Sequence, residues 1–151
     1  MKQQMWVLCM AGALAGAGLG KYATVVVGDS IAGVRLGMTL SEVRKLGIEL
    51  VPEGIDREIG VGWMAGPLLV IFDDKERAMT VSLDLRRSAG AKIGKIVIPA
   101  LTKLDDIAKL IPGCTLSMGS GGRALACKNE AGKVTNFYDS YGSNELWVIM
   151  P

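Results

Sequence analysis

The spacing of hydrophobic and polar residues changes period in each half of the chain. In the first half, residues 31–36 read as a short extended segment, and Gly37 bends the chain. Thr39 and Glu42 then form a capping box, in which each side chain satisfies a backbone donor at the start of a helix. We therefore predict a short helix over residues 39–46. Its apolar stripe consists of Leu40, Val43 and Leu46.

After this helix the pattern takes on the twofold period of β-strands. Residues 67–74 (PLLVIFDD) and 78–85 (AMTVSLDL) flank a charged turn at residues 75–77. In the second of these segments apolar residues alternate with polar ones, so one side of the strand faces a core and the other faces solvent. The two segments predict a β-hairpin.

The second half of the chain repeats this order. Residues 92–113 contain another extended segment and another short helical stripe, with Thr102 and Asp105 in place of the first capping box. Residues 123–140 then alternate as a hairpin, and residues 144–150 add a further strand. Each half is thus a helix followed by strands.

One such half is too small to bury both faces of its own sheet. We therefore expect an α+β fold in which two tandem helix-plus-β-hairpin repeats, residues 31–87 and 92–151, form one antiparallel sheet with the helices packed on one face. An apolar leader helix over residues 1–20 and a linker over residues 21–30 precede this compact domain.

The leader differs in composition from the rest of the chain. Lys2 gives it a positive start, residues 5–20 carry no charge, and Ala-x-Ala sites occur at residues 13–15 and 15–17. This is the pattern of a secretory signal peptide. We therefore expect a periplasmic or secreted protein.

The alternative is that the leader is retained as a membrane anchor. Gly12, Gly16 and Gly20 recur every fourth residue, so on a helix they form one stripe of small residues that lets membrane helices pack closely. The protein would then be a structural subunit of an envelope complex, anchored in the inner membrane and facing the periplasm.

Composition and charge argue against several classes of function. Half of the 151 residues are apolar, which is enough for one core. The 17 basic and 15 acidic residues leave a net charge of only +2, which argues against a nucleic-acid partner. Because the chain has no histidine, the commonest general base and metal ligand, we expect no enzymatic activity, no metal site and no cofactor.

One short motif points in another direction. Residues 25–30 run from three valines into Gly28, Asp29 and Ser30, and they resemble the opening block of the GDS(L)-type esterases and lipases. In that family a histidine late in the chain activates the serine, whereas this chain has none. A serine esterase is therefore a remote alternative, and we expect residues 28–30 to form a turn with Ser30 exposed in the linker.

The cysteines support export. If the leader is removed Cys9 goes with it, and Cys114 and Cys127 remain as an even pair. A disulfide between them would close a short glycine-containing loop and contribute about 3 kcal/mol in the chain-entropy picture. The alternative is two buried free thiols in a cytosolic protein, and the leader favours the disulfide.

The aromatic residues are the best candidates for binding. Only eight occur, and four of them lie in residues 137–147. Tyr and Trp dominate protein interfaces because they are large, stiff and partly polar. The alternative for Phe137 and Trp147 is a place in the core. The candidate partner-binding residues are Trp63, Tyr138, Tyr141 and Trp147.

The stretch around the first capping box resembles a known family. An extended entry into Leu-Gly-Met-Thr-x-x-Glu-Val is similar to the motif of small exported bacterial proteins of the β-lactamase-inhibitor-protein-like fold and of the related outer-membrane assembly lipoproteins (SmpA/OmlA). These proteins grip a partner with a concave sheet. The residues that carry the resemblance are Leu36, Gly37, Met38, Thr39, Glu42 and Val43.

The resemblance implies a function that agrees with the composition. We expect a non-enzymatic, exported bacterial module that binds another protein through its sheet, as an inhibitor, an immunity protein or an envelope-assembly factor. The wider similarity includes the tandem repeat and the cysteine pair after the second helix. The second copy departs from the motif, because Pro99, Ala100 and Leu101 replace Gly-Met-Thr.

Overall fold

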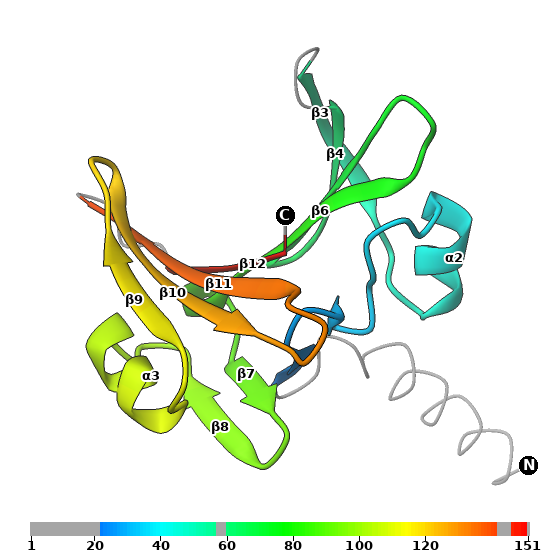
Figure 1. The fold of residues 1–151 in the computed structure, drawn as a ribbon. Coiled ribbons are helices and arrows are strands. Elements are labelled where there is room, and N and C mark those ends of the chain that lie inside the picture. The colour runs from blue at the N-terminus through cyan, green and yellow to red at the C-terminus, as the bar shows by residue number, and fades with distance from the viewer. Residues whose placement is uncertain (1–21, 57–59, 142–145, 151) are drawn as a thin grey trace, which may run out of the picture.

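The fold is mainly β, and the prediction of an α+β fold is wrong. The computed structural model describes residues 22–56, 60–141 and 146–150. Strands make up 52% of the described residues and helices only 13%. The strands form two sheets, one of eight strands and one of four, instead of a single sheet covered by helices (Figure 1).

The larger sheet contains four strands from each half of the chain. Its order is β3-β4-β5-β6-β12-β11-β10-β9, and every neighbouring pair is antiparallel. The last strands of the two halves, β6 and β12, therefore meet at its middle. We call β3 to β6 the first arm and β9 to β12 the second arm. The strands are β3 (Val51–Asp56), β4 (Gly60–Ala65), β5 (Leu68–Phe72), β6 (Ala78–Asp84), β9 (Thr115–Met118), β10 (Gly122–Lys128), β11 (Val134–Ser140) and β12 (Leu146–Met150).

The smaller sheet combines one hairpin from each half. Its order is β2-β1-β7-β8, and the two hairpins meet where β1 runs parallel to β7. Residues 21–30, expected as a linker, contain β1 and the first residue of β2, and Ala23 and Val25 of β1 are buried in the core. The strands are β1 (Ala23–Val26), β2 (Ser30–Ile31), β7 (Gly90–Ile93) and β8 (Ile96–Pro99).

The helices are too short to cover the larger sheet. α2 (Leu40–Lys45) buries only Val43, and α3 (Leu104–Leu110) buries Leu104 and Ile107. A helix of fewer than two turns presents one or two side chains to a core. The larger sheet instead shares one cluster of buried residues with the smaller sheet. The fold is mainly β because the two sheets, and not the helices, supply most of this core. A 3-10 turn, η1 (Leu85–Arg87), follows β6.

The start of α2 agrees with the sequence. Thr39 Oγ1 accepts a hydrogen bond from the Glu42 amide at 3.2 Å, and the Glu42 carboxylate accepts one from the Thr39 amide at 3.1 Å. The capping box is thus confirmed. In α3 the N-cap residue is Lys103, whose side chain makes no capping bond, so the prediction that Thr102 begins this helix is wrong.

The larger sheet is curved, and one of its faces is open. In Figure 1, β3 and β4 rise on one side of β12, and the hairpin of β9 and β10 rises on the other. Both helices and the smaller sheet lie on the convex side, and no other described element lies on the concave side. We call the concave side the open face.

Candidate functional site

The centre of the open face is formed by a pair of aromatic residues. Along β11 and β12, Phe137 and Val148 are fully buried toward the core, whereas the alternate residues Tyr138 and Trp147 are only partly buried. Successive side chains of a strand point to opposite faces, so Tyr138 and Trp147 lie on the open face. The strand register places them directly opposite each other. Phe137 is thus a core residue, and Trp147 is not.

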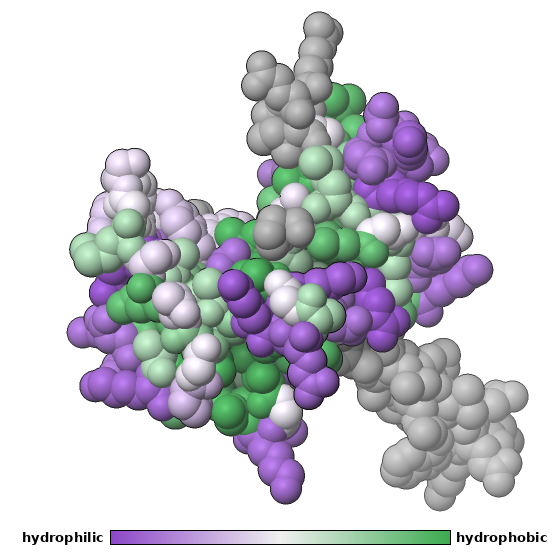
Figure 2. Space-filling model, in the orientation of Figure 1, coloured by the Kyte–Doolittle hydropathy of each residue, from purple (hydrophilic) through white to green (hydrophobic). Residues whose placement is uncertain are grey.

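An apolar row continues from this pair onto the first arm. Met64, Leu69, Ser82 and Ile149 are successive cross-strand partners on β4, β5, β6 and β12. The three apolar members of the row are partly exposed. Figure 2 shows hydrophobic residues gathered between the two arms. The open face therefore carries apolar side chains near the middle of the sheet, with the buried Ser82 between Leu69 and Ile149 and the buried Asp84 opposite Trp147.

The glycine-rich tip of the second arm makes room for Tyr138. A Cβ atom built on Gly121 or Gly122 would lie 3.1 or 3.0 Å from the Tyr138 hydroxyl oxygen. Gly122 also faces the Asp139 carbonyl, which a Cβ would approach to 2.3 Å. These two glycines therefore have a packing role beside the aromatic pair.

The other two candidate residues lie elsewhere. Trp63 is the cross-strand partner of Val70, so it lies on the core side of β4, where it packs against the core. The Arg44 guanidinium of α2 lies 5.4 Å from its ring centroid. Tyr141 follows β11, is 51% exposed and donates its amide hydrogen to the Gly121 carbonyl. The structure thus brings together Tyr138 and Trp147 but not Trp63 or Tyr141.

The predicted disulfide is present. Cys114 directly precedes β9, Cys127 lies in β10, and their sulfur atoms are bonded with the Cα atoms 4.5 Å apart. The pair continues the register of Thr115 with Ala126 by one step, so the bond closes the base of the hairpin. A structural disulfide is typical of an oxidising, extracytoplasmic compartment.

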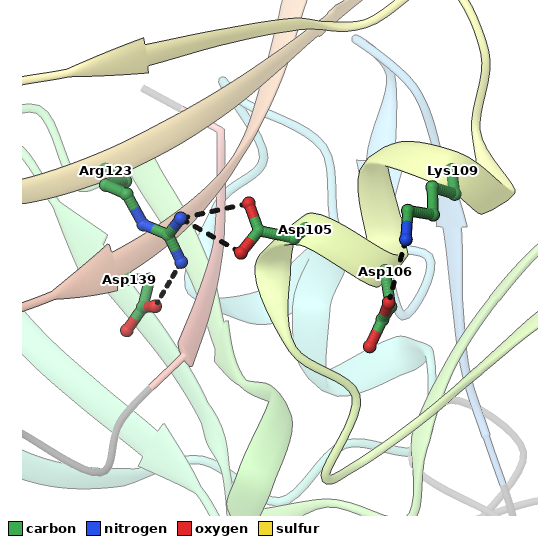
Figure 3. A network of polar contacts seen from close by, with 5 residues as sticks. All are labelled: Asp105, Asp106, Lys109, Arg123 and Asp139. Carbon is green, nitrogen blue, oxygen red and sulfur yellow. Dashed lines mark hydrogen bonds and ion pairs between the residues drawn. The ribbon is translucent and has the colours of Figure 1, made fainter.

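A network of charges holds α3 against the second arm (Figure 3). Arg123 Nη1 donates to both carboxylate oxygens of Asp105, at 3.0 and 3.2 Å, and Nη2 donates to Asp139 at 3.5 Å. The hydrogen bond to Asp105 is the largest effect and raises the pKa of Arg123, while desolvation opposes it. Lys109 pairs with Asp106 at 3.7 Å. Asp105 and Asp106 thus serve as ion-pair partners within this network.

The Gly-Asp-Ser segment has a structural role. The Gly28 amide donates to Thr135 Oγ1 at 2.7 Å, and Asp29 pairs with Arg35 Nε at 3.2 Å. Ser30 belongs to β2 and is only 5% exposed, so the expectation that it is exposed is wrong. The reason is that β2 pairs with β1 inside the smaller sheet. The segment therefore packs the start of the described chain against the second arm.

The signal peptide and the alternative membrane anchor are both predictions about the leader. Residues 1–20, with the glycine stripe of Gly12, Gly16 and Gly20, lie outside the described residues. Within the described residues, no helix has both the length and the apolar character needed to cross a bilayer. The same part of the chain holds no group of three or more Cys, Asp or Glu side chains placed to bind a metal ion.

Comparisons of the chain with family models, with curated proteins and with solved structures find no match. The resemblance carried by the motif around Thr39 therefore stays a prediction. Function has to be argued from the geometry of the open face.

Proposed function

We propose that this protein is a non-enzymatic, exported module that binds another protein on the open face of its larger sheet. One observation carries the proposal: the eight-stranded sheet has its convex side covered by the rest of the fold and its concave side lined at the centre by Tyr138 and Trp147.

The chemistry of this surface favours a protein partner. Large aromatic residues near the middle of a surface contribute most to the free energy of protein binding, because each buries a large area with few rotatable bonds. A contiguous apolar surface on a soluble domain is also typical of interaction sites. Met64, Leu69 and Ile149 add apolar side chains to the aromatic pair, with Ser82 between Leu69 and Ile149. A curved face of eight strands fits a convex protein surface.

Other features support export and a binding role. The disulfide fits an oxidising compartment, and the leader has the composition of a signal peptide. The chain lacks histidine, the commonest general base, which argues against catalysis. The carboxylate of Asp73 accepts hydrogen bonds from the Lys75 and Arg77 amides and so stabilises a turn. Within the exported binding proteins, inhibitor, immunity protein and envelope-assembly factor all agree with this surface.

Site-specific photo-cross-linking tests the proposal. The full chain, with a C-terminal tag, is expressed in a bacterium with a photoreactive phenylalanine analogue at Tyr138. A matched variant carries the analogue at Leu101, which is 80% exposed in the segment between β8 and α3. We expect a discrete cross-linked protein from position 138 and none from position 101. Equal cross-linking from both positions, or none from position 138, would contradict binding on the open face.

Cell fractionation of the same tagged protein tests export. We expect a soluble periplasmic product without the leader, whose mass is lower by two hydrogens before reduction than after it. A membrane-bound product that retains Met1 would instead support the anchored alternative.

A further inference from the structure

We propose that a hollow on the first arm of the open face receives an apolar side chain of the protein partner that has a basic residue next to it. This inference rests on the proposed function and assigns the anchor point of the same surface. The hollow has a volume of about 250 Å³. Its walls include Glu53, Gly54, Ile55, Gly62, Leu69 and Ile71.

Two opposed glycines form the hollow, and the fold gives no steric reason for them. Gly54 of β3 is the cross-strand partner of Gly62 of β4. Neither has the positive φ that favours glycine. A Cβ atom on Gly54 would meet nothing within 4 Å, and one on Gly62 would make only ordinary contacts, the nearest with Leu69 at 3.5 Å.

A third glycine in the lining of the hollow, Gly60, is required by the backbone. Gly60 has a φ of +136°, and its Cβ would lie 2.3 Å from the Phe72 carbonyl oxygen. Glycine inside a strand weakens the strand, because it loses more backbone entropy and has no side chain to pack. Glycine at positions 54 and 62 therefore works against folding, and its effect is to keep space open on the surface.

The walls specify the chemistry of the occupant. Leu69 and Ile71 lie on the open face, because they alternate with the buried Val70. Ile55 also borders the hollow, but it pairs with Val61, so its side chain belongs to the opposite face of the sheet. An apolar side chain in the hollow would bury Leu69 and Ile71 from water. The hollow is smaller than the roughly 300–1,000 Å³ of sites that enclose small molecules, so it suits one side chain held in place by a larger interface.

The charge of Glu53 indicates a basic residue next to the apolar side chain of the partner. Among the described residues, Glu53 is the only charged one in the walls of the hollow, and its Cβ lies 4.0 Å from the position of a Cβ on Gly62. No ion pair of Glu53 occurs within the described residues. A Lys or Arg next to the apolar anchor of the partner would supply the missing counter-charge.

The hollow is continuous with the aromatic centre. Gly62 is the cross-strand partner of Ile71, and the next pair on the same face of these two strands, Met64 with Leu69, belongs to the apolar row. A partner seated on Tyr138 and Trp147 would thus reach the hollow along the open face.

A titration with blocked dipeptides tests the inference. The probe is N-acetyl-phenylalanyl-lysine amide, and the readout is the backbone amide resonances of the isotopically labelled, exported protein. We expect saturable shifts centred on Gly54 and Gly62. In Gly62→Val, binding should weaken at least about tenfold because valine fills the hollow, while the midpoint of thermal unfolding stays equal or rises because valine favours strands. Absence of saturable shifts, or equal binding by Gly62→Val, would overturn the proposal.

Two controls make the test specific. Gly119→Ala changes a glycine that also lacks a positive φ, at the tip of the second arm, and should bind the probe like the wild type. If Gly62→Val does not fold, Gly54→Ala gives the same test, since a Cβ there meets nothing within 4 Å. Replacing lysine by glutamate in the probe should weaken binding several-fold through repulsion by Glu53. Equal binding of the two probes would overturn the inference that a basic residue lies next to the apolar anchor.

The outcomes separate this inference from the proposed function. Cross-linking from Tyr138 without dipeptide binding would keep the partner on the open face and reject the hollow as its anchor. Dipeptide binding without cross-linking would support the hollow and contradict the proposed partner. A dimer in sedimentation that Gly62→Val dissociates would assign the hollow to a second copy of the chain and overturn the proposal.

Discussion

Each arm of the larger sheet consists of four antiparallel strands that follow a short helix in the chain. The two arms are attached to the rest of the fold in different ways. The second arm has a disulfide at the base of its outer hairpin and the Arg123 network to α3. The first arm contains no cysteine. It is held by backbone bonds between the Gly37–Met38 segment and β6, and by Arg44 above Trp63.

The edge strands differ as well. β3 carries Pro52, Glu53 and a bulge next to them, which are devices that discourage edge-to-edge association. β9 reads TLSM, with no charge, no proline and no register shift, and both Leu116 and Met118 are exposed. The covalent cross-link is thus in the arm whose edge has no other protection. The first arm, which carries the proposed anchor site at Gly54 and Gly62, has no cross-link.

The largest expected effect comes from the cross-link of the second arm. Replacing both Cys114 and Cys127 by serine should lower the free energy of unfolding by about 3 kcal/mol, because the unfolded chain regains the entropy of the open loop. Urea unfolding measures this change. The wild-type protein under reducing conditions is the control and should lose a similar amount. A loss below about 0.5 kcal/mol would show that the hairpin is held by its backbone pairing alone.

The turn between β1 and β2, which packs against the second arm, should be the next most sensitive position. Gly28 has a φ of +70°, and its Cβ would lie 2.6 Å from the Lys133 carbonyl oxygen. Gly28→Ala should therefore lower the free energy of unfolding by about 2 kcal/mol. The control is Gly37→Ala, before α2, where φ is +87° and a Cβ meets nothing within 4 Å. It should cost only the backbone strain, about 1 kcal/mol. Equal losses would contradict the clash.

The two helices offer a comparison of caps. Thr39→Ala should destabilise the protein by about 1 kcal/mol, because α2 loses the hydroxyl that accepts from the Glu42 amide. Lys103→Ser should stabilise it by about 0.5 kcal/mol, because the N-cap of α3 has no side-chain bond. Thermal unfolding of both variants measures the two changes. Changes of the same sign would contradict the assigned caps.

The smallest expected effect concerns the cation above Trp63. Arg44→Gln should lower the free energy of unfolding by about 0.5 kcal/mol, because it removes the attraction between the guanidinium and the ring. Tryptophan fluorescence during urea unfolding follows the change. Lys45→Gln on the same helix is the matched control and should have less effect. A larger loss for Lys45→Gln would contradict the contact.

Local patterns predicted the parts of the fold whose cause is local. The capping box at Thr39 needs only residues three apart. β5 was recognisable as a short apolar run before a charged turn, and β6, β10 and β11 were recognisable from their alternating patterns. The cysteine pair was predicted from the parity of the cysteines and the leader.

Of the strands that the sequence did not predict, β3, β4 and β9 have weak local patterns. β3 contains a proline and a glycine, and β4 contains two glycines, residues that disfavour strands in isolation. β9 has only four residues, all exposed. These segments are strands because β10 and β5 offer partners to their backbones, which is a property of neighbours distant in sequence.

The same division applies to the candidate site. By itself, the sequence determined which residue types were available: few aromatic residues, no histidine, two cysteines outside the leader and nearly balanced charge. Only the tertiary structure decided that Tyr138 and Trp147 share the open face, that Trp63 lies on the opposite side, and that Gly54 and Gly62 are paired in the lining of a hollow. The physical reason is register: a shift of one residue in strand pairing moves a side chain to the other face, and pairing depends on the whole sheet.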